Sequence, residues 1–346
     1  MNRAGISCPF VAGPKIKELN RFAGRREELK FLADRMSGSQ PVSVNVVGER
    51  LSGKSSLLQH FTNIWPHLGP DSSRFLVVFI CLRLNKPKTE AEFYQTLAAA
   101  LHDKLPDAPA VSSSSAFEKE ILDKLAGQGL LPVFCLDEFE KLFDHIGELN
   151  KDFYDRLGGL LKSNRMMLII ATRKPLKIYG EEYQLESAFF TFGMMQRLGD
   201  FSDDEADELL LLPDPAAPAL DVEERKVAKE LGGRTPYRLQ LAAFYLFEAR
   251  RCGKNTAWAK RQFKEQLGQT KLRSIWTRPL GLVLRSRRKL LDPLAEDSEK
   301  CRKVLVNIVL PLLVLIGIPL LLVLWLAGWL TSAKLLELYQ QLRGLL

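Results

Sequence analysis

One stretch of the chain has the residue types and spacing of a phosphate-binding loop. Residues 48–55 read GERLSGKS and fit the pattern G-x-x-x-x-G-K-[ST]. Glycines let such a loop curl so that its N–H groups face phosphate oxygens at the start of a helix. In this pattern the lysine, here Lys54, reaches the β- and γ-phosphates, and the hydroxyl of Ser55 coordinates Mg²⁺. The predicted nucleotide contacts of the loop are Gly48, Glu49, Arg50, Leu51, Ser52, Gly53, Lys54, Ser55 and Ser56.

Two carboxylates follow a second apolar stretch, at 133–136. In nucleotide hydrolases an acid after such a strand holds Mg²⁺, which we expect of Asp137. We expect Glu138 to polarise the attacking water as a general base. The alternative is a solvated acidic helix start (Asp137, Glu138, Glu140), which the helix dipole also favours. The phosphate-binding loop upstream makes the catalytic interpretation the preferred one.

A third apolar stretch, at 167–171, ends in Thr172 and Arg173. Polar residues at the carboxyl end of a parallel strand lie on the edge where α/β sheets bind ligands. We therefore predict that Thr172 or Arg173 contacts the γ-phosphate. The alternative is a loop arginine beside Lys174 with no ligand.

Alternating strands and helices must position these residues. The predicted strands are 42–47, 75–82, 132–136 and 167–171, with a weaker one at 188–192. The predicted helices between them are 54–64, 90–104, 116–125 and 149–161. This alternation predicts an α/β fold with a mostly parallel sheet and helices on both faces.

Residues 200–250 change character and are predicted to be mainly helical. Ser202 with Glu205 forms a capping box that opens a helix at 203–212. A second helix is predicted at 221–231, ended by two glycines, and Pro236 begins a long third one. We therefore predict a separate helical domain after the sheet.

The composition excludes two classes of protein. With 46% hydrophobic residues the chain is not intrinsically disordered. Its five cysteines are scattered, with no C-x-x-C spacing, so it is not a small disulfide-stapled scaffold. Residues 271–303 hold +6 of the net charge of +8, so the body before them is nearly neutral.

This basic stretch precedes a long apolar one. Residues 304–332 carry no charge, and about 20 apolar residues suffice to cross a bilayer. The alternative is a buried helix of a soluble domain, which rarely runs this long without polar residues. The Lys/Arg excess before the span predicts that the N-terminal body stays on the cytoplasmic side. We therefore predict a single-pass membrane protein with a C-terminal anchor.

The predicted organisation has six parts. They are an N-terminal segment (1–40), an α/β ATPase domain (41–198), a helical lid (199–270), a basic juxtamembrane linker (271–303), a transmembrane helix (304–330) and a short amphipathic tail (331–346).

The motifs together resemble those of AAA+/STAND-type P-loop ATPases, related to origin-recognition ATPases. Residues 22–29 read FAGRREEL and resemble the F-x-G-R-x-x-E-L motif before the first strand, and 233–236 resemble the G-x-P motif of the lid. The resemblance implies that Gly24, Arg25 and Pro236 surround the base, that Arg173 is the sensor arginine, and that ATP and Mg²⁺ are the cofactors. It also implies ATP-dependent homo-oligomers, although no arginine finger is assignable.

Two functions that use ATP are consistent with these motifs. The first is a membrane-anchored ATP-dependent switch that controls self-assembly or binding of an unidentified protein partner, in signalling or defence. The second is a DNA-handling ATPase of the origin-recognition or transposition-regulator type that is tethered to the membrane. Nucleic acid is the less favoured partner because the body is nearly neutral. A degenerate, non-hydrolysing scaffold is disfavoured because Lys54, Ser55, Asp137 and Glu138 are all present.

Overall fold

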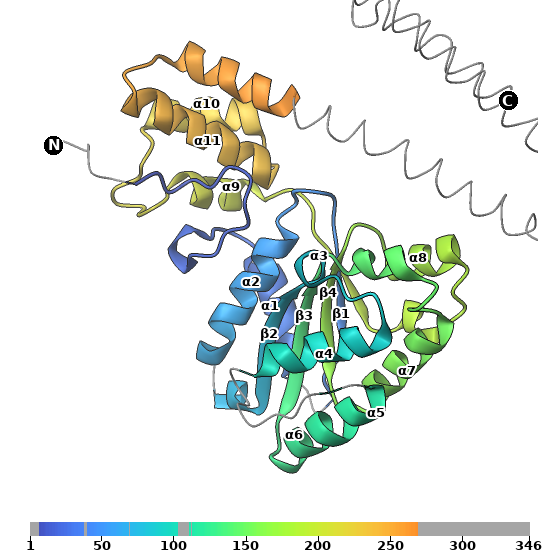
Figure 1. Cartoon of the computed structure of the whole chain (residues 1–346). Coiled ribbons are helices and arrows are strands. Elements are labelled where there is room, and N and C mark those ends of the chain that lie inside the picture. Colours follow the sequence, from blue (N-terminus) through green and yellow to red (C-terminus); the bar gives the residue numbers. More distant parts are fainter. Residues whose placement is uncertain (1–6, 38–39, 69, 103–110, 112, 269–346) are drawn as a thin grey trace, which may run out of the picture. The chain divides into compact units, whose positions relative to one another are not determined.

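The computed structural model describes residues 7–268, except 38–39, 69, 103–110 and 112 (Figure 1). The described residues up to 265 belong to one compact unit. The predicted linker (271–303), transmembrane helix (304–330) and tail (331–346) lie outside the described residues. Within the part that is described, no helix is both long and apolar enough to cross a membrane.

The core of this unit is a sheet of five parallel strands in the order β2-β3-β4-β1-β5. The strands are β1 (Val44–Val47), β2 (Phe75–Cys81), β3 (Leu131–Asp137), β4 (Met167–Thr172) and β5 (Met194–Arg197). The predicted α/β fold with a parallel sheet is therefore confirmed. All five strands point the same way, so the loops after β1, β3 and β4, which are neighbours in the sheet, open at one edge.

Helices cover both faces of the sheet because alternate strand residues point to opposite sides. Val133 and Cys135 of β3 join one apolar cluster with α1 (Arg26–Met36) and α2 (Lys54–Ile64). Phe134 and Leu136 of the same strand join the other cluster, on the opposite face. That face is covered by α4 (Glu90–Leu101), α5 (Ser114–Phe117), η4 (Glu118–Leu122), α6 (Asp123–Gly127), α7 (Lys151–Lys162) and α8 (Leu176–Tyr183). The short elements are η1 (Leu19–Arg21), η2 (Trp65–His67), η3 (Pro70–Arg74), α3 (Leu82–Asn85), η5 (Phe139–His145) and η6 (Ala188–Thr191).

The weaker strand predicted at 188–192 is wrong. Ser187 caps this segment as the 3₁₀ helix η6, and Phe189 and Phe190 are buried among the aromatic residues of η5 and α7. The fifth strand comes later, after Gly193, whose φ of +74° makes the turn. Met194 then donates its N–H to the Ser43 carbonyl (2.9 Å), which starts the pairing of β5 with β1.

The helical lid follows the sheet, as predicted. It contains α9 (Asp203–Leu210), α10 (Val222–Gly232), α11 (Pro236–Arg251) and a further helix at 256–268, drawn in orange in Figure 1. The predicted capping box is present: the Ser202 hydroxyl accepts from the Glu205 N–H, and the Glu205 carboxylate accepts from the Ser202 N–H. Pro236 is the first residue of α11, where its missing N–H costs nothing.

Candidate nucleotide-binding site

The phosphate-binding loop connects β1 to α2, so it opens at the carboxyl edge of the sheet. Leu51 and Gly53 adopt left-handed conformations, with φ of +68° and +96°, which curl the loop. Gly48 must be a glycine, because a Cβ there would lie 2.6 Å from the Ser52 Oγ and 3.0 Å from the Leu198 carbonyl oxygen. The loop therefore has the strand–loop–helix context that its pattern requires.

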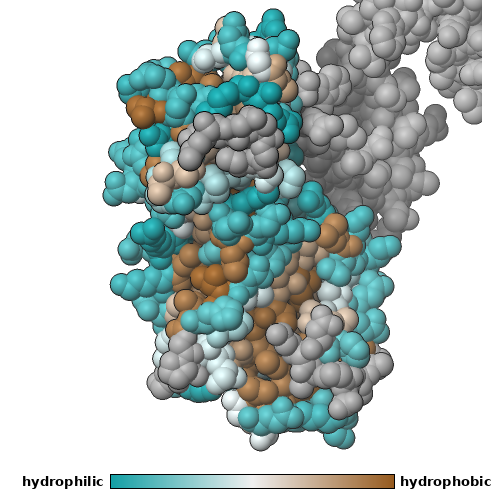
Figure 2. Space-filling view, turned by 90° about the vertical axis from the view of Figure 1, so that its left-hand side faces the viewer, coloured by the Kyte–Doolittle hydropathy of each residue, from teal (hydrophilic) through white to brown (hydrophobic). Residues whose placement is uncertain are grey.

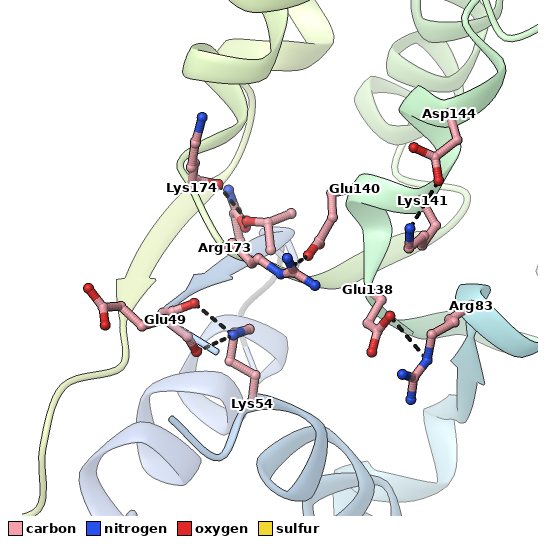
Figure 3. A network of polar contacts seen from close by, with 12 residues as sticks. Glu49, Lys54, Arg83, Glu138, Glu140, Lys141, Asp144, Arg173 and Lys174 are labelled. Carbon is pink, nitrogen blue, oxygen red and sulfur yellow. Dashed lines mark hydrogen bonds and ion pairs between the residues drawn. The ribbon is translucent and has the colours of Figure 1, made fainter. Parts of the chain in front are cut away.

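Lys54 is folded back on the loop. Its ammonium donates to the carbonyls of Gly48 and Glu49, both at 2.7 Å (Figure 3). Burial lowers the pKa of this ammonium below its usual value, while the carboxylates of Glu140 and Asp137 act in the opposite direction. A partly buried ammonium facing two acids is suited to bind the anionic phosphates of a nucleotide.

Asp137 and Glu138 lie next to each other at the end of β3 but have different surroundings. Asp137 is buried, and its Oδ1 has no hydrogen-bond partner among the described residues. Glu138 adopts a left-handed conformation (φ +54°), and its Oε2 pairs with the Arg83 Nε of α3 at 3.3 Å (Figure 3). The Asp137 oxygen is therefore available to a ligand, whereas the Glu138 carboxylate pairs with an exposed cation.

A third carboxylate, Glu140 in η5, belongs to the same site. Its Oε1 pairs with the Arg173 Nε at 2.9 Å, and its Oε2 is buried without a partner among the described residues. Burial raises the pKa of this carboxyl, although Arg173 and Lys54 oppose the rise. Figure 3 shows Lys54, Glu138, Glu140 and Arg173 around one shared space.

The sequence interpretation did not assign Glu140 to the site. It counted Glu140 only as part of a possible acidic helix start. Its position three residues after Asp137 could have indicated this role, because one helical turn returns the Glu140 side chain to the carboxyl edge of the sheet.

Thr172 is buried, whereas the side chain of Arg173 is exposed. The Thr172 hydroxyl lies 2.8 Å from the Asn45 Oδ1 and 2.7 Å from the Lys174 carbonyl oxygen, so it is engaged within the fold. The side chain of Arg173 is 53% exposed, and among the described residues its ion-pair partner is Glu140 alone. Of the two candidates, Arg173 is therefore the one that the structure leaves able to meet a phosphate.

Residues of the N-terminal segment before the motif at 22–29 also contact the helix that follows the phosphate-binding loop. The Ile16 N–H donates to the Ser56 Oγ (3.0 Å), so this hydroxyl is engaged by protein. The Lys15 ammonium donates to the Gln59 Oε1 (3.0 Å) and lies over the Phe79 ring. On the lid side, the Val11 N–H donates to the Gln240 Oε1 of α11 (3.0 Å).

The residues assigned to the base by resemblance are buried at the junction of sheet and lid. Arg25 is 4% exposed, and its guanidinium contacts the Ser52 and Gly199 carbonyls and the Glu28 carboxylate. Gly24 packs against Phe201 and Glu205 of the lid. Pro236 is buried at the start of α11. The guanidinium of Arg25 therefore contacts the backbone of the phosphate-binding loop, at the Ser52 carbonyl.

The residues present fit a magnesium ion held jointly with phosphates. Among the described residues, no group of three or more His, Cys, Asp or Glu side chains is arranged to hold a metal ion. Mg²⁺ in nucleotide sites is typically bound by one or two carboxylates together with substrate phosphates. The unpartnered Asp137 Oδ1 and the Ser55 hydroxyl at the first turn of α2 provide such a partial set.

A hollow of about 510 Å³ lies elsewhere, between the edge strand β2 and α4. Phe79, Ile80 and Ala100 are among its lining residues. No residue of the phosphate-binding loop lines it, and neither do the carboxylates at 137, 138 and 140. Figure 2 looks onto the side of the molecule where β2 is the edge strand and shows apolar residues exposed there. This hollow is separate from the nucleotide site.

Comparison with known proteins identifies the domain that carries this site. Residues 43–212 match the NACHT domain family, and they include the loop, the acids and Arg173. This part of the chain is similar to a NACHT domain. It is a P-loop ATPase module, so the predicted ATPase activity and STAND-type resemblance are confirmed at this level. No curated protein sequence matches the chain significantly.

Solved structures with the same fold include three archaeal proteins. The Walker-type ATPase PABY2304 of Pyrococcus abyssi is 17% identical, with a TM-score of 0.58 over 77% of this chain and 79% of that one. The ORC1 protein of Aeropyrum pernix, in complex with DNA, is 16% identical, with a TM-score of 0.51 over 73% of this chain and 66% of that one. The ORC2 protein of the same organism is 15% identical, with a TM-score of 0.53 over 74% and 70%. These similarities show that the sheet and the lid share the fold of these three proteins.

Proposed function

We propose that this protein is a membrane-anchored, Mg-ATP-dependent switch. Its nucleotide state controls self-assembly, or the binding of a protein partner, at the cytoplasmic face of the membrane. The observation that carries the proposal is the grouping of Lys54, Glu138, Glu140 and Arg173 around one space at the carboxyl edge of the sheet.

Each residue has a role that follows from its position. With nucleotide bound, Lys54 would exchange its loop carbonyls for the β- and γ-phosphates, and Ser55 with Asp137 would hold Mg²⁺, which would supply positive charge against the phosphates. Glu138 takes a proton from the attacking water. Arg173 leaves Glu140 for the γ-phosphate, which ADP lacks. This exchange of partners is what distinguishes the two nucleotide states.

Two structural features support a switch rather than a housekeeping hydrolase. The carboxylate of Glu140 already neutralises the γ-phosphate sensor Arg173, so the ATP state must break a protein contact to form. Arg25 of the N-terminal segment connects the lid to the loop: its N–H donates to the Glu205 carboxylate of α9, and its guanidinium donates to the Gly199 and Ser52 carbonyls. Hydrolysis is therefore expected to be slow and coupled to a conformational change.

Membrane anchoring is proposed from the amino-acid sequence. The uncharged run at 304–332 and the basic stretch before it lie outside the described residues. With the Lys/Arg excess on its N-terminal side, the NACHT-like domain and lid are placed in the cytoplasm. The test is protease protection of the full chain in sealed membrane vesicles: the body should be cleaved from the cytoplasmic side. Extraction of the chain by alkaline carbonate would contradict a spanning anchor.

The ATP-dependent assembly has a direct test. The full chain in detergent, with Glu138→Gln, should form larger particles with Mg-ATP than with Mg-ADP, and the trapped form should be used to capture the partner. Lys54→Ala is the matched control and should give one particle size in both nucleotides. Identical sizes for Glu138→Gln in ATP and ADP would contradict nucleotide-controlled assembly.

One observation favours the alternative function of a DNA-handling ATPase. In the described part of the lid, Lys254, Lys260, Arg261 and Lys264 have no ion-pair partner, whereas Arg250 and Arg251 are paired with acids. Lys260, Arg261 and Lys264 lie on the helix at 256–268, and such cations can contact phosphates of a nucleic acid. The test is DNA binding by the full chain at several salt concentrations. A steep slope of log affinity against log salt concentration, made shallower by Lys260→Glu and Arg261→Glu, would support this alternative. No DNA binding at low salt would contradict it.

A further inference from the structure

Arg25 makes four contacts that join three parts of the molecule. It caps the start of α1 in a left-handed conformation, with φ of +63°. Its Nη2 donates to the Ser52 carbonyl of the phosphate-binding loop (3.3 Å) and to the Gly199 carbonyl before the lid (2.6 Å). Its Nη1 pairs with the Glu28 Oε1 (2.8 Å). The guanidinium also lies 4.7 Å from the ring centroid of Phe201.

The backbone of the same residue is held by the lid. The Arg25 N–H donates to the Glu205 Oε1 of α9, while the Glu205 Oε2 accepts from the Ser202 N–H (2.8 Å). The preceding residue, Gly24, leaves no spare room, because a Cβ there would lie 3.0 Å from the Glu205 Cβ and 3.1 Å from the Phe201 ring. Any movement of α9 relative to the loop must therefore strain or break the contacts of Arg25.

The contact with Ser52 has a consequence for phosphate binding. The Ser52 carbonyl and the Gly53 N–H belong to one planar peptide unit, in which the C=O and N–H point in opposite directions. A guanidinium that holds the oxygen therefore fixes the direction of the Gly53 N–H. That N–H is one of the loop donors predicted to face the nucleotide phosphates. Arg25 can thus orient a phosphate-binding group without touching the nucleotide.

We infer that Arg25 is a positioning residue that couples the phosphate-binding loop to the lid. Its guanidinium aligns the Ser52–Gly53 peptide for phosphate and, through the Gly199 carbonyl and the Glu205 contact, transmits the state of the loop to α9. This role rests on the proposed nucleotide binding and replaces the base contact that the motif resemblance implies for Arg25.

A ligand without a base separates this role from a base contact. The probes are Mg-ATP and magnesium tripolyphosphate, with the full chain carrying Arg25→Met. Since the loop donor serves both ligands, their affinities should fall by the same factor, about tenfold for one lost charge-assisted alignment. Arg25→Lys, which keeps the charge but can reach only one carbonyl, should recover part of this loss.

The relay to the lid has its own readout. Mg-ATP should change the amide hydrogen exchange of residues 203–210 in the unmodified chain, and Arg25→Met should remove that change. Arg26→Met is the matched control: Arg26 pairs with Glu208 of the same helix at 3.1 Å but is 81% exposed, so its loss should leave the response intact. If Arg25→Met unfolds because Glu28 is left unpaired, Arg25→Met/Glu28→Gln removes that charge and is measured instead.

Three outcomes would overturn the inference. A loss of affinity for ATP but not for tripolyphosphate would show that Arg25 contacts the base. Unchanged affinity for both ligands would reduce Arg25 to a structural ion pair with Glu28. An unchanged response of residues 203–210 in Arg25→Met would disconnect Arg25 from the lid. Failure of the unmodified chain to bind either ligand would instead contradict the proposed function itself.

Discussion

Replacing Glu138 by glutamine should stop ATP turnover while leaving the fold and ATP binding intact. The side chain of Glu138 is paired with Arg83 at 3.3 Å, and Arg83 is 62% exposed. Exposed ion pairs contribute about 0.2–1 kcal/mol. Glutamine keeps the shape of the side chain, so the free energy of unfolding should fall by less than about 1 kcal/mol.

The effect on turnover should be far larger. A positioned general base contributes about 10²- to 10⁴-fold to the rate, so kcat should fall at least about 100-fold. The Kd for Mg-ATP should stay within a factor of about three, because Lys54, Ser55 and Asp137 keep their contacts and removing a nearby negative charge does not oppose phosphate binding. Phosphate release at saturating Mg-ATP and nucleotide binding by titration measure the two quantities separately.

Glu140→Gln is the matched comparison, because it removes the other carboxylate of the site. Glu140 holds Arg173 at 2.9 Å, so its replacement should free the sensor and change the ATP affinity as well as the rate. If Glu138→Gln kept its rate within about threefold of the unmodified chain while Glu140→Gln lost about 100-fold, the base would be Glu140. The assignment of Glu138 would then be wrong.

Three other predictions follow from the same contacts. Lys54→Ala should abolish Mg-ATP binding, because nothing else in the loop supplies a flexible ammonium, and unchanged affinity in a binding titration would refute the site. Arg173→Ala should weaken ATP binding by about tenfold or more while changing ADP binding little, since only ATP has the γ-phosphate; equal losses for both would make Arg173 a general phosphate contact. Burial raises the pKa of Glu140 from its usual value of 4.5, so charging this carboxyl costs more in the folded chain than in the unfolded chain, and stability is lost as pH rises through the raised pKa. The unfolding free energy of Glu140→Gln relative to the unmodified chain should therefore increase between pH 4.5 and neutrality, as chemical denaturation at several pH values would show.

Much of the sheet was predictable because its strands are buried on both faces. Four strands are short runs of Val, Ile, Leu and Phe, and each ends close to its predicted position. The fifth, β5, was missed because its sequence, MMQR, is largely exposed and carries no apolar pattern. Its place is fixed by pairing with β1 and by the turn at Gly193, and neither is visible in the local sequence.

The site divides in a similar way. The loop 48–55 and the pair Asp137–Glu138 could be found from the sequence, because their chemistry depends on neighbouring residues and on a strand that ends beside them. Glu140 was not found, because its role depends on Arg173, which is distant in the chain and adjacent only in the folded sheet.

The sequence alone therefore determined the phosphate chemistry, the parallel sheet and the helical lid, since local spacing and burial are enough to specify them. Only the tertiary structure decided what the buried charges do. Arg25 pairs with Glu28, three residues later in the sequence, but it also donates to the carbonyls of Ser52 and Gly199, contacts that no local pattern encodes. A buried guanidinium must satisfy its N–H groups with whatever acceptors the fold brings to it, and those acceptors come from distant segments.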